Sequence, residues 1–94
     1  MNKTIIIYAG KSCPFSKRLR DDLDAAHIAY ELKIVEHDEK ACIEMYELTK
    51  KPWTPVTKIT IDRKDSIILG YNKEKKKQIE ELLHLTLEHK RAII

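Results

Sequence analysis

The chain has 94 residues, of which 43% are hydrophobic and 35% are charged, and its formal net charge is +3. A chain of this length can bury one small core, so we expect a single domain over residues 1–94. The small net charge and the few aromatic residues argue against nucleic-acid binding. The first apolar run, at residues 4–8, is too short for a signal sequence or a membrane span. Composition therefore predicts a cytoplasmic protein that has no membrane partner and keeps its two cysteines reduced.

The first part of the chain predicts a strand, a helix and a second strand. Residues 4–8 form a continuous apolar run, which is typical of a strand covered on both faces. Pro14 suits the first position of a helix that we expect to end near His27. Alternation of apolar and polar residues over 30–34 predicts the second strand. The helix is expected to carry Phe15, Leu19, Leu23 and Ala26 on its inner face, and Lys17, Arg18, Arg20, Asp21, Asp22 and Asp24 on its outer face.

Two polar residues mark the starts of the remaining helices. Asp38 and Asn72 are good helix caps, because their side chains accept hydrogen bonds from the first-turn N–H groups. We expect, in order, a helix over 39–50, an irregular segment over 51–55, strands over 56–61 and 66–69 joined by a four-residue loop, and a helix from 73 past His84. The inner face of the helix over 39–50 is expected to carry Ala41, Cys42, Met45, Leu48 and Thr49.

The element order β-α-β-α-β-β-α predicts an α/β protein. A right-handed crossover makes the first two strands parallel, and the hairpin adds two antiparallel strands. The result is a four-stranded mixed sheet with helices on both faces. This is the thioredoxin-like fold.

Cys13 is expected at the N-cap of the first helix, directly before Pro14. The backbone N–H groups of Phe15 and Ser16 would point at its sulfur, where the helix dipole favours a negative charge. Basic side chains nearby add positive potential: Lys11, Lys17 and Arg18. Thiols in such settings have pKa values of about 3.5–7.5, so we expect Cys13 to react as a thiolate.

Ser16 stands three residues after Cys13, where a Cys-x-x-Cys pair has its second thiol. Its hydroxyl can donate a hydrogen bond to the thiolate but cannot displace a mixed disulfide. A disulfide at Cys13 must then be resolved by an external thiol, for which glutathione is the natural candidate. Cys42, inside the second helix, is expected to be a small buried apolar side chain, with a distant resolving thiol as the alternative.

Three segments together resemble the glutaredoxin family over nearly the whole chain. Cys13-Pro14-Phe15-Ser16 is similar to its Cys-Pro-Tyr-Cys active site, with one working cysteine. Thr54-Pro55 resembles the family's cis-proline motif. Leu69-Gly70-Tyr71-Asn72 is similar to the Gly-Gly-Tyr-Asp segment before the last helix.

The resemblance implies an enzyme that reduces glutathione mixed disulfides by a monothiol mechanism, with Cys13 and Ser16 as catalytic residues. Glutathione would be the co-substrate, and the partners would be glutathionylated proteins or low-molecular-weight disulfides. Thr54 would pair with the cysteinyl part of glutathione, and the start of the last helix would bind its γ-glutamyl carboxylate. Lys11 or Lys51 would bind its glycyl carboxylate. The implied glutathione-binding residues are Lys11, Phe15, Lys51, Thr54, Pro55, Gly70, Tyr71 and Asn72. No metal is expected, because His84 and His89 lie five residues apart rather than four.

Three alternatives remain open at this point. A monothiol glutaredoxin can hold an iron–sulfur cluster with glutathione between two subunits, and an arsenate reductase also uses one cysteine on this fold. The third alternative is a redox-inactive interaction module. It is motivated by a broad apolar band near the end of the chain, which could also mediate dimerisation of an otherwise monomeric protein. The band consists of Ile79, Leu82, Leu83, Leu85, Leu87, Ile93 and Ile94.

Overall fold

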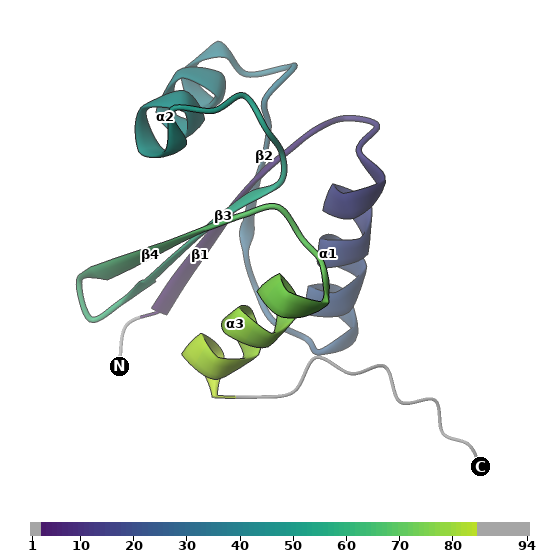
Figure 1. The fold of residues 1–94 in the computed structure, drawn as a ribbon, viewed down its shortest axis with the longest axis vertical. Helices are drawn as coiled ribbons and strands as arrows, with labels where there is room; N and C mark the ends of the chain where they lie inside the picture. Colours follow the sequence, from purple (N-terminus) through teal and green to yellow (C-terminus); the bar gives the residue numbers. More distant parts are fainter. Residues whose placement is uncertain (1–2, 85–94) are drawn as a thin grey trace.

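The computed structural model describes residues 3–84, in which three helices pack on a four-stranded sheet (Figure 1). In chain order the elements are β1 (Lys3–Ala9), α1 (Pro14–Ala25), β2 (Glu31–Ile34), α2 (Glu39–Thr49), β3 (Val56–Ile61), β4 (Lys64–Leu69) and α3 (Lys73–Leu83). The predicted element order is confirmed.

The sheet has the strand order β2-β1-β3-β4. β1 is parallel to β2 and antiparallel to β3, and β3 and β4 form an antiparallel hairpin. α1 and α3 cover one face and α2 covers the other (Figure 1). The predicted mixed sheet with helices on both faces is therefore confirmed. Within residues 3–84, no helix combines the length and the apolar character needed to cross a membrane.

The apolar run of β1 reflects burial on both faces. Ile5, Ile7 and Ala9 face α1 and α3, whereas Ile6 and Tyr8 face α2. The core beneath α1 and α3 is completed by Leu19, Leu23, Ile59, Ile68, Tyr71, Ile79 and Leu83. The smaller core beneath α2 consists of Tyr8, Ala41, Met45 and Val56. The two cores lie on either side of β1, which makes this strand the centre of the fold.

The first turn of α1 differs from the prediction in its rotation. Phe15, expected on the inner face, is 52% exposed, and the neighbouring Ser16 is buried instead. Ser16 points inward because its Oγ accepts a hydrogen bond from the N–H of Gly10 at 3.3 Å. This bond joins the helix to the end of β1 and turns Phe15 toward solvent.

Asp22 was also predicted on the outer face of α1, and this prediction is wrong. Asp22 is 8% exposed and accepts a hydrogen bond from the hydroxyl of Tyr71, which belongs to the connection between β4 and α3. Lys76 approaches the same carboxylate to 4.0 Å. A charged residue lies here at the boundary of the core because a tyrosine hydroxyl from a distant segment needs an acceptor.

α2 confirms the predicted cap but not the predicted inner face. The side chain of Asp38 accepts from the N–H of Ala41 at 3.1 Å. Only Ala41 and Met45 of this helix are buried, whereas Cys42 and Leu48 are exposed. The expectation of a buried Cys42 is therefore wrong. α2 contacts the sheet along a stripe one residue wide, at i and i+4, and leaves its neighbouring positions to solvent.

The hairpin between β3 and β4 is tighter than expected. Its turn consists of Asp62 and Arg63, which have positive φ values of 50° and 72°, instead of a four-residue loop. Two consecutive left-handed residues form a turn that matches the twist of the strands. The sequence did not predict it, because Arg63 stands where the usual Asp-Gly signal has glycine.

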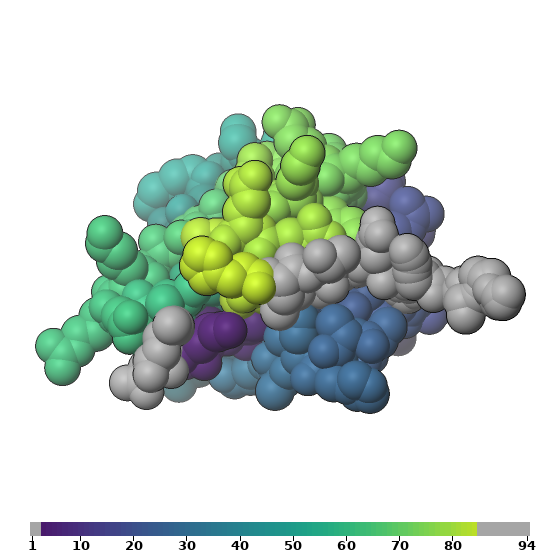
Figure 2. All heavy atoms as spheres, turned by 90° about the horizontal axis from the view of Figure 1, so that it is seen from below, coloured from purple at the N-terminus to yellow at the C-terminus, as the bar shows by residue number. Residues whose placement is uncertain are grey.

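α3 has the predicted cap, since the side chain of Asn72 accepts from the N–H of Lys75 at 2.9 Å. The helix ends at Leu83 rather than past His84, which adopts a left-handed conformation with φ of 56°. Figure 2 shows the end of α3 between the β3–β4 hairpin and the α1–β2 connection. Ile79 and Leu83 of the apolar band are core residues, and Leu82 packs against them. The band's other members, Leu85, Leu87, Ile93 and Ile94, lie outside the described residues.

Candidate functional site

The site is built where β1 ends and α1 begins. Cys13 is the N-cap of α1, with the extended backbone angles φ −84° and ψ 116°. Its Sγ lies 3.7 Å from the carbonyl oxygen of Thr54, to which the thiol donates. The peptide bond between Thr54 and Pro55 is cis. Residues that are 41 positions apart therefore meet at the sulfur, as the sequence motifs lead one to expect.

The pKa of the Cys13 thiol lies below its ordinary value of 9.0. Partial burial raises this pKa, but hydrogen bonds to the sulfur outweigh the burial. The donors are the hydroxyl and N–H of Ser16, the side chain of Thr54 and the N–H of Phe15. Three of these four hydrogen bonds come from the first turn of α1, as expected for a thiol at a helix N-terminus.

Ser16 is 1% exposed and connects the nucleophile to the sheet. Its Oγ accepts from Gly10, and a hydrogen bond between its hydroxyl and the sulfur of Cys13 lowers the pKa of the thiol. This pair of bonds orients the hydroxyl toward the thiolate. Ser16 is therefore a positioning and pKa-lowering residue, and it contributes no second thiol.

Replacing Ser16 with alanine should raise the pKa of Cys13 and slow its reaction at acidic pH. Losing one hydrogen bond to the thiolate, worth about 1 kcal/mol, predicts an alkylation rate at mildly acidic pH that is about three- to tenfold lower. The rate should be measured against pH in a Cys42→Ser background, so that one thiol reacts. Ser12→Ala, at an exposed position in the same loop, is the matched control. An unchanged pH profile for Ser16→Ala would contradict this role.

Gly10 lets the parts of the site approach one another. A Cβ at this position would lie 2.9 Å from Thr54 Oγ1, 3.1 Å from Cys13 Cβ and 3.7 Å from Glu36 Oε2. The first two distances are too short for a side chain without displacement of its neighbours. Gly10 therefore marks the point around which Cys13, Thr54 and Glu36 converge. Glu36 is not among the predicted site residues, because nothing near residue 36 in the sequence indicates a contact with the first loop.

Two aromatic side chains adjoin the site and are largely exposed. Phe15 follows Cys13 by two residues and is 52% exposed, and Trp53 precedes Thr54 and is 58% exposed. The ammonium group of Lys51 lies 4.8 Å from the centre of the Trp53 ring. Lys11, the other predicted cation, is exposed on the loop before Cys13. Trp53 was not among the predicted site residues, although its position beside Thr54 was the available signal.

The segment before α3, Gly70 to Asn72, makes contacts within the protein. Tyr71 is 5% exposed and its hydroxyl donates to Asp22, so its side chain belongs to the core. Gly70 has a positive φ of 79°, and its N–H donates to the carbonyl of Pro55 at 2.7 Å. Asn72 uses its side chain to cap α3. These contacts attach the start of α3 to the cis-proline segment.

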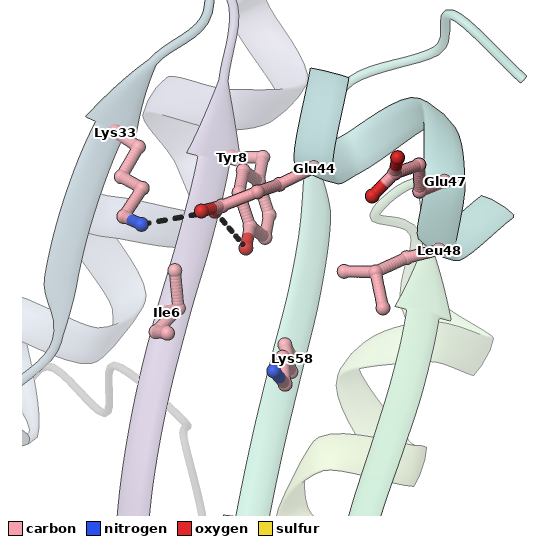
Figure 3. A pocket seen from close by; sticks show the side chains of 7 residues that line it. All are labelled: Ile6, Tyr8, Lys33, Glu44, Glu47, Leu48 and Lys58. Carbon is pink, nitrogen blue, oxygen red and sulfur yellow. Dashed lines mark hydrogen bonds and ion pairs between the residues drawn. The ribbon is translucent and has the colours of Figure 1, made fainter. Parts of the chain in front are cut away.

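A separate cavity of about 370 Å³ lies on the α2 face of the sheet (Figure 3). None of the predicted site residues lines it; its lining consists of Ile6, Tyr8, Lys33, Glu44, Glu47, Leu48 and Lys58. The Oε1 atom of Glu44 accepts from the Tyr8 hydroxyl and from Lys33 Nζ, each at 3.0 Å. The ammonium of Lys33 also lies 5.7 Å from the centre of the Tyr8 ring. This network joins α2 to the sheet.

The raised pKa values of two tyrosines lead us to expect a loss of stability at alkaline pH. Burial, together with the hydrogen bond to Glu44, raises the pKa of Tyr8 from 10.0 to about 12, and burial and Asp22 raise the pKa of Tyr71. Above pH 10 the unfolded chain loses protons that the folded chain keeps, so the free energy of unfolding should fall as the pH rises. Tyr8 alone should account for about 1–3 kcal/mol by pH 12.

Denaturant unfolding at pH 9, 10 and 11 measures this dependence. Tyr8→Phe, which has no titrating hydroxyl, should show a shallower fall than the wild type. Equal slopes for the two proteins would show that Tyr8 does not carry the effect.

Among residues 3–84, no three His, Cys, Asp or Glu side chains are grouped so that they could hold a metal ion. Cys13 and Cys42 are both free thiols. The groups described at the site are the sulfur of Cys13 and the hydrogen-bond donors around it.

A scan of protein-family models gives no match, and a search of curated proteins finds no similar sequence. Among solved structures, the chain resembles a glutaredoxin from Archaeoglobus fulgidus, with 21% identity, a TM-score of 0.64 and 84% of each chain covered. It also resembles a variant of the thioredoxin-like protein BC3987, with 24% identity and a TM-score of 0.71, over 87% of this chain and 96% of the other. These likenesses concern the fold. The chain has the thioredoxin-like α/β fold that its element order predicts.

Proposed function

We propose that the protein is a glutaredoxin-like thiol–disulfide oxidoreductase that reduces glutathione mixed disulfides by a monothiol mechanism. The observation that carries this proposal is Cys13 at the N-cap of α1, where hydrogen bonds lower the pKa of its thiol and Ser16 occupies the place of a second cysteine. A lowered pKa supplies thiolate near neutral pH and makes the sulfur a good leaving group.

The reaction follows from this arrangement in two exchanges. The Cys13 thiolate attacks the glutathione sulfur of a mixed disulfide, the sulfur–sulfur bond breaks, and the substrate leaves as a thiolate that takes a proton. A second glutathione, as thiolate, then attacks the Cys13–glutathione disulfide. Oxidised glutathione forms and the Cys13 thiolate is regenerated. For each substrate thiol released, one free glutathione is consumed and one molecule of oxidised glutathione forms; the disulfide bond is only transferred, and the proposed reaction uses no metal.

The groups around Cys13 support binding of glutathione on the Thr54 side. The cis-proline segment, Thr54 and Pro55, would pair with its cysteinyl part, and the first N–H groups of α3 suit a carboxylate. Because the side chain of Tyr71 is in the core, we assign to Gly70, Tyr71 and Asn72 a contribution through the backbone. Lys51 or Lys11 would bind the glycyl carboxylate.

The exposed aromatic residues favour protein substrates over small ones. Phe15 follows Cys13 by two residues, Trp53 directly precedes Thr54, and both offer exposed apolar area to a polypeptide. Glutathionylated proteins are therefore the preferred substrates under this proposal, and low-molecular-weight disulfides the lesser ones.

Steady-state kinetics with a neutral glutathionylated peptide test the proposal. A two-exchange reaction predicts ping-pong kinetics in peptide and glutathione. Mass spectrometry of enzyme quenched during turnover should find one glutathione on Cys13. Sequential kinetics, or turnover that needs a dithiol in place of glutathione, would contradict the monothiol mechanism.

A further inference from the structure

A carboxylate lies beside the loop that carries the nucleophile. Glu36 follows β2, and its Oε1 accepts a hydrogen bond from the backbone N–H of Lys11 at 2.9 Å. This bond joins residues 25 positions apart. The side chain is exposed, so its carboxylate accepts from the loop backbone and is still accessible to an incoming substrate.

The strand order places this charge on a definite side of Cys13. β2 and β3 are the two neighbours of β1, so Glu36 after β2 and Thr54 before β3 lie on opposite sides of the end of β1. A Cβ built on Gly10 would approach both Thr54 Oγ1 and Glu36 Oε2, so both side chains reach the loop that carries Cys13. If glutathione lies along Thr54, the other half of a mixed disulfide meets Glu36.

The positive charge of Lys11 does not fully cancel the negative charge of Glu36. Lys11 offers its backbone N–H to the carboxylate, while its ammonium group is at the end of a long exposed side chain. A side chain of that kind samples many rotamers, whereas the carboxylate is attached to the loop by a hydrogen bond. An incoming group therefore meets a negative charge at a defined position.

We propose that Glu36 is a specificity-determining residue, which favours glutathionylated cysteines flanked by basic residues over those flanked by acidic ones. This inference rests on the proposed function and names the substrate class of the same site. Glutathione is common to all such substrates, so Glu36 ranks them by the charge of the polypeptide. The expected discrimination is about two- to fivefold for one charge at a solvent-exposed site.

Three peptides test this inference. Each has a glutathionylated cysteine, and the two residues that flank it are lysines in the first peptide, serines in the second and glutamates in the third. The wild type should show a higher kcat/KM for the lysine peptide than for the glutamate peptide. Glu36→Gln keeps an oxygen that can accept from Lys11 and removes the charge, so the ratio of the two values should fall about two- to fivefold. About 1 M salt should lower the wild-type ratio in the same way, because the Debye length is then about 3 Å.

Glu81→Gln is the matched control. Glu81 is exposed on α3, far from the β1–α1 loop in sequence, and its substitution removes the same charge as Glu36→Gln. It should keep the wild-type ratio. A ratio unchanged in Glu36→Gln, while the serine peptide is still reduced, would overturn the inference and leave the proposed function standing. A wild type that reduces none of the three peptides would instead overturn the proposed function.

Discussion

Replacing Cys13 with serine should reduce the exchange of glutathione mixed disulfides to the uncatalysed rate. Cys13 is the group placed to attack, because its sulfur faces Thr54 and is hydrogen-bonded by the first turn of α1. A serine hydroxyl is not ionised at neutral pH and forms no disulfide, so neither exchange can begin. The measurement is reduction of a glutathionylated peptide coupled to recycling of oxidised glutathione. Circular dichroism should show that the variant keeps its fold.

Cys42→Ser is the matched control for this prediction. Cys42 is exposed on α2, so its replacement creates no cavity and should leave both activity and stability close to wild type. Activity that survives in Cys13→Ser and is lost in Cys42→Ser would contradict the proposed site. Loss of activity in both variants would show that Cys42 resolves the disulfide, which would contradict the monothiol mechanism.

Replacing Asp22 with alanine should lower the free energy of unfolding by about 2–3 kcal/mol. Asp22 is 8% exposed and accepts the hydroxyl of Tyr71, which is itself 5% exposed. Without the carboxylate, a buried hydroxyl loses its acceptor and α1 loses a contact to the segment before α3. Tyr71→Phe removes the hydroxyl together with its need for a partner, so it should cost less, about 1 kcal/mol. Denaturant unfolding of both single variants and of the double variant measures the coupling.

Asp21 offers a control on the next position of the same helix. Its carboxylate forms an exposed i, i+4 pair with Lys17 at 3.1 Å, with 54% of the Asp21 side chain exposed. Asp21→Ala should therefore cost less than about 0.5 kcal/mol. Equal losses for Asp21→Ala and Asp22→Ala would show that the bond to Tyr71 is not what stabilises this region.

The comparison of Asp21 with Asp22 also shows where local pattern stops predicting structure. The sequence pattern places both aspartates on the polar face of an amphipathic helix, but only Asp21 is at the surface. The partner that draws Asp22 inward is 49 residues away. Similarly, Cys42 has apolar neighbours in sequence, but α2 contacts the sheet through a stripe too narrow to include it.

The sequence by itself determined the element order, the three helix caps and the position of the nucleophile. Caps are predictable because an N-cap side chain bonds to N–H groups within three residues, as Asp38 and Asn72 do. Cys13 is predictable as the N-cap for a different local reason, because Pro14 suits the first helical position.

The sequence motifs implied Thr54 and the first turn of α1 beside the sulfur, and only the tertiary structure decided the further contacts and the inward turn of Ser16. Thr54 reaches Cys13 from the start of β3, and Glu36 reaches the first loop from the end of β2. Ser16, and not Phe15, turns inward because the end of β1 offers the N–H of Gly10. These contacts depend on strand order and register, which bring together residues that no local hydrogen-bonding pattern relates.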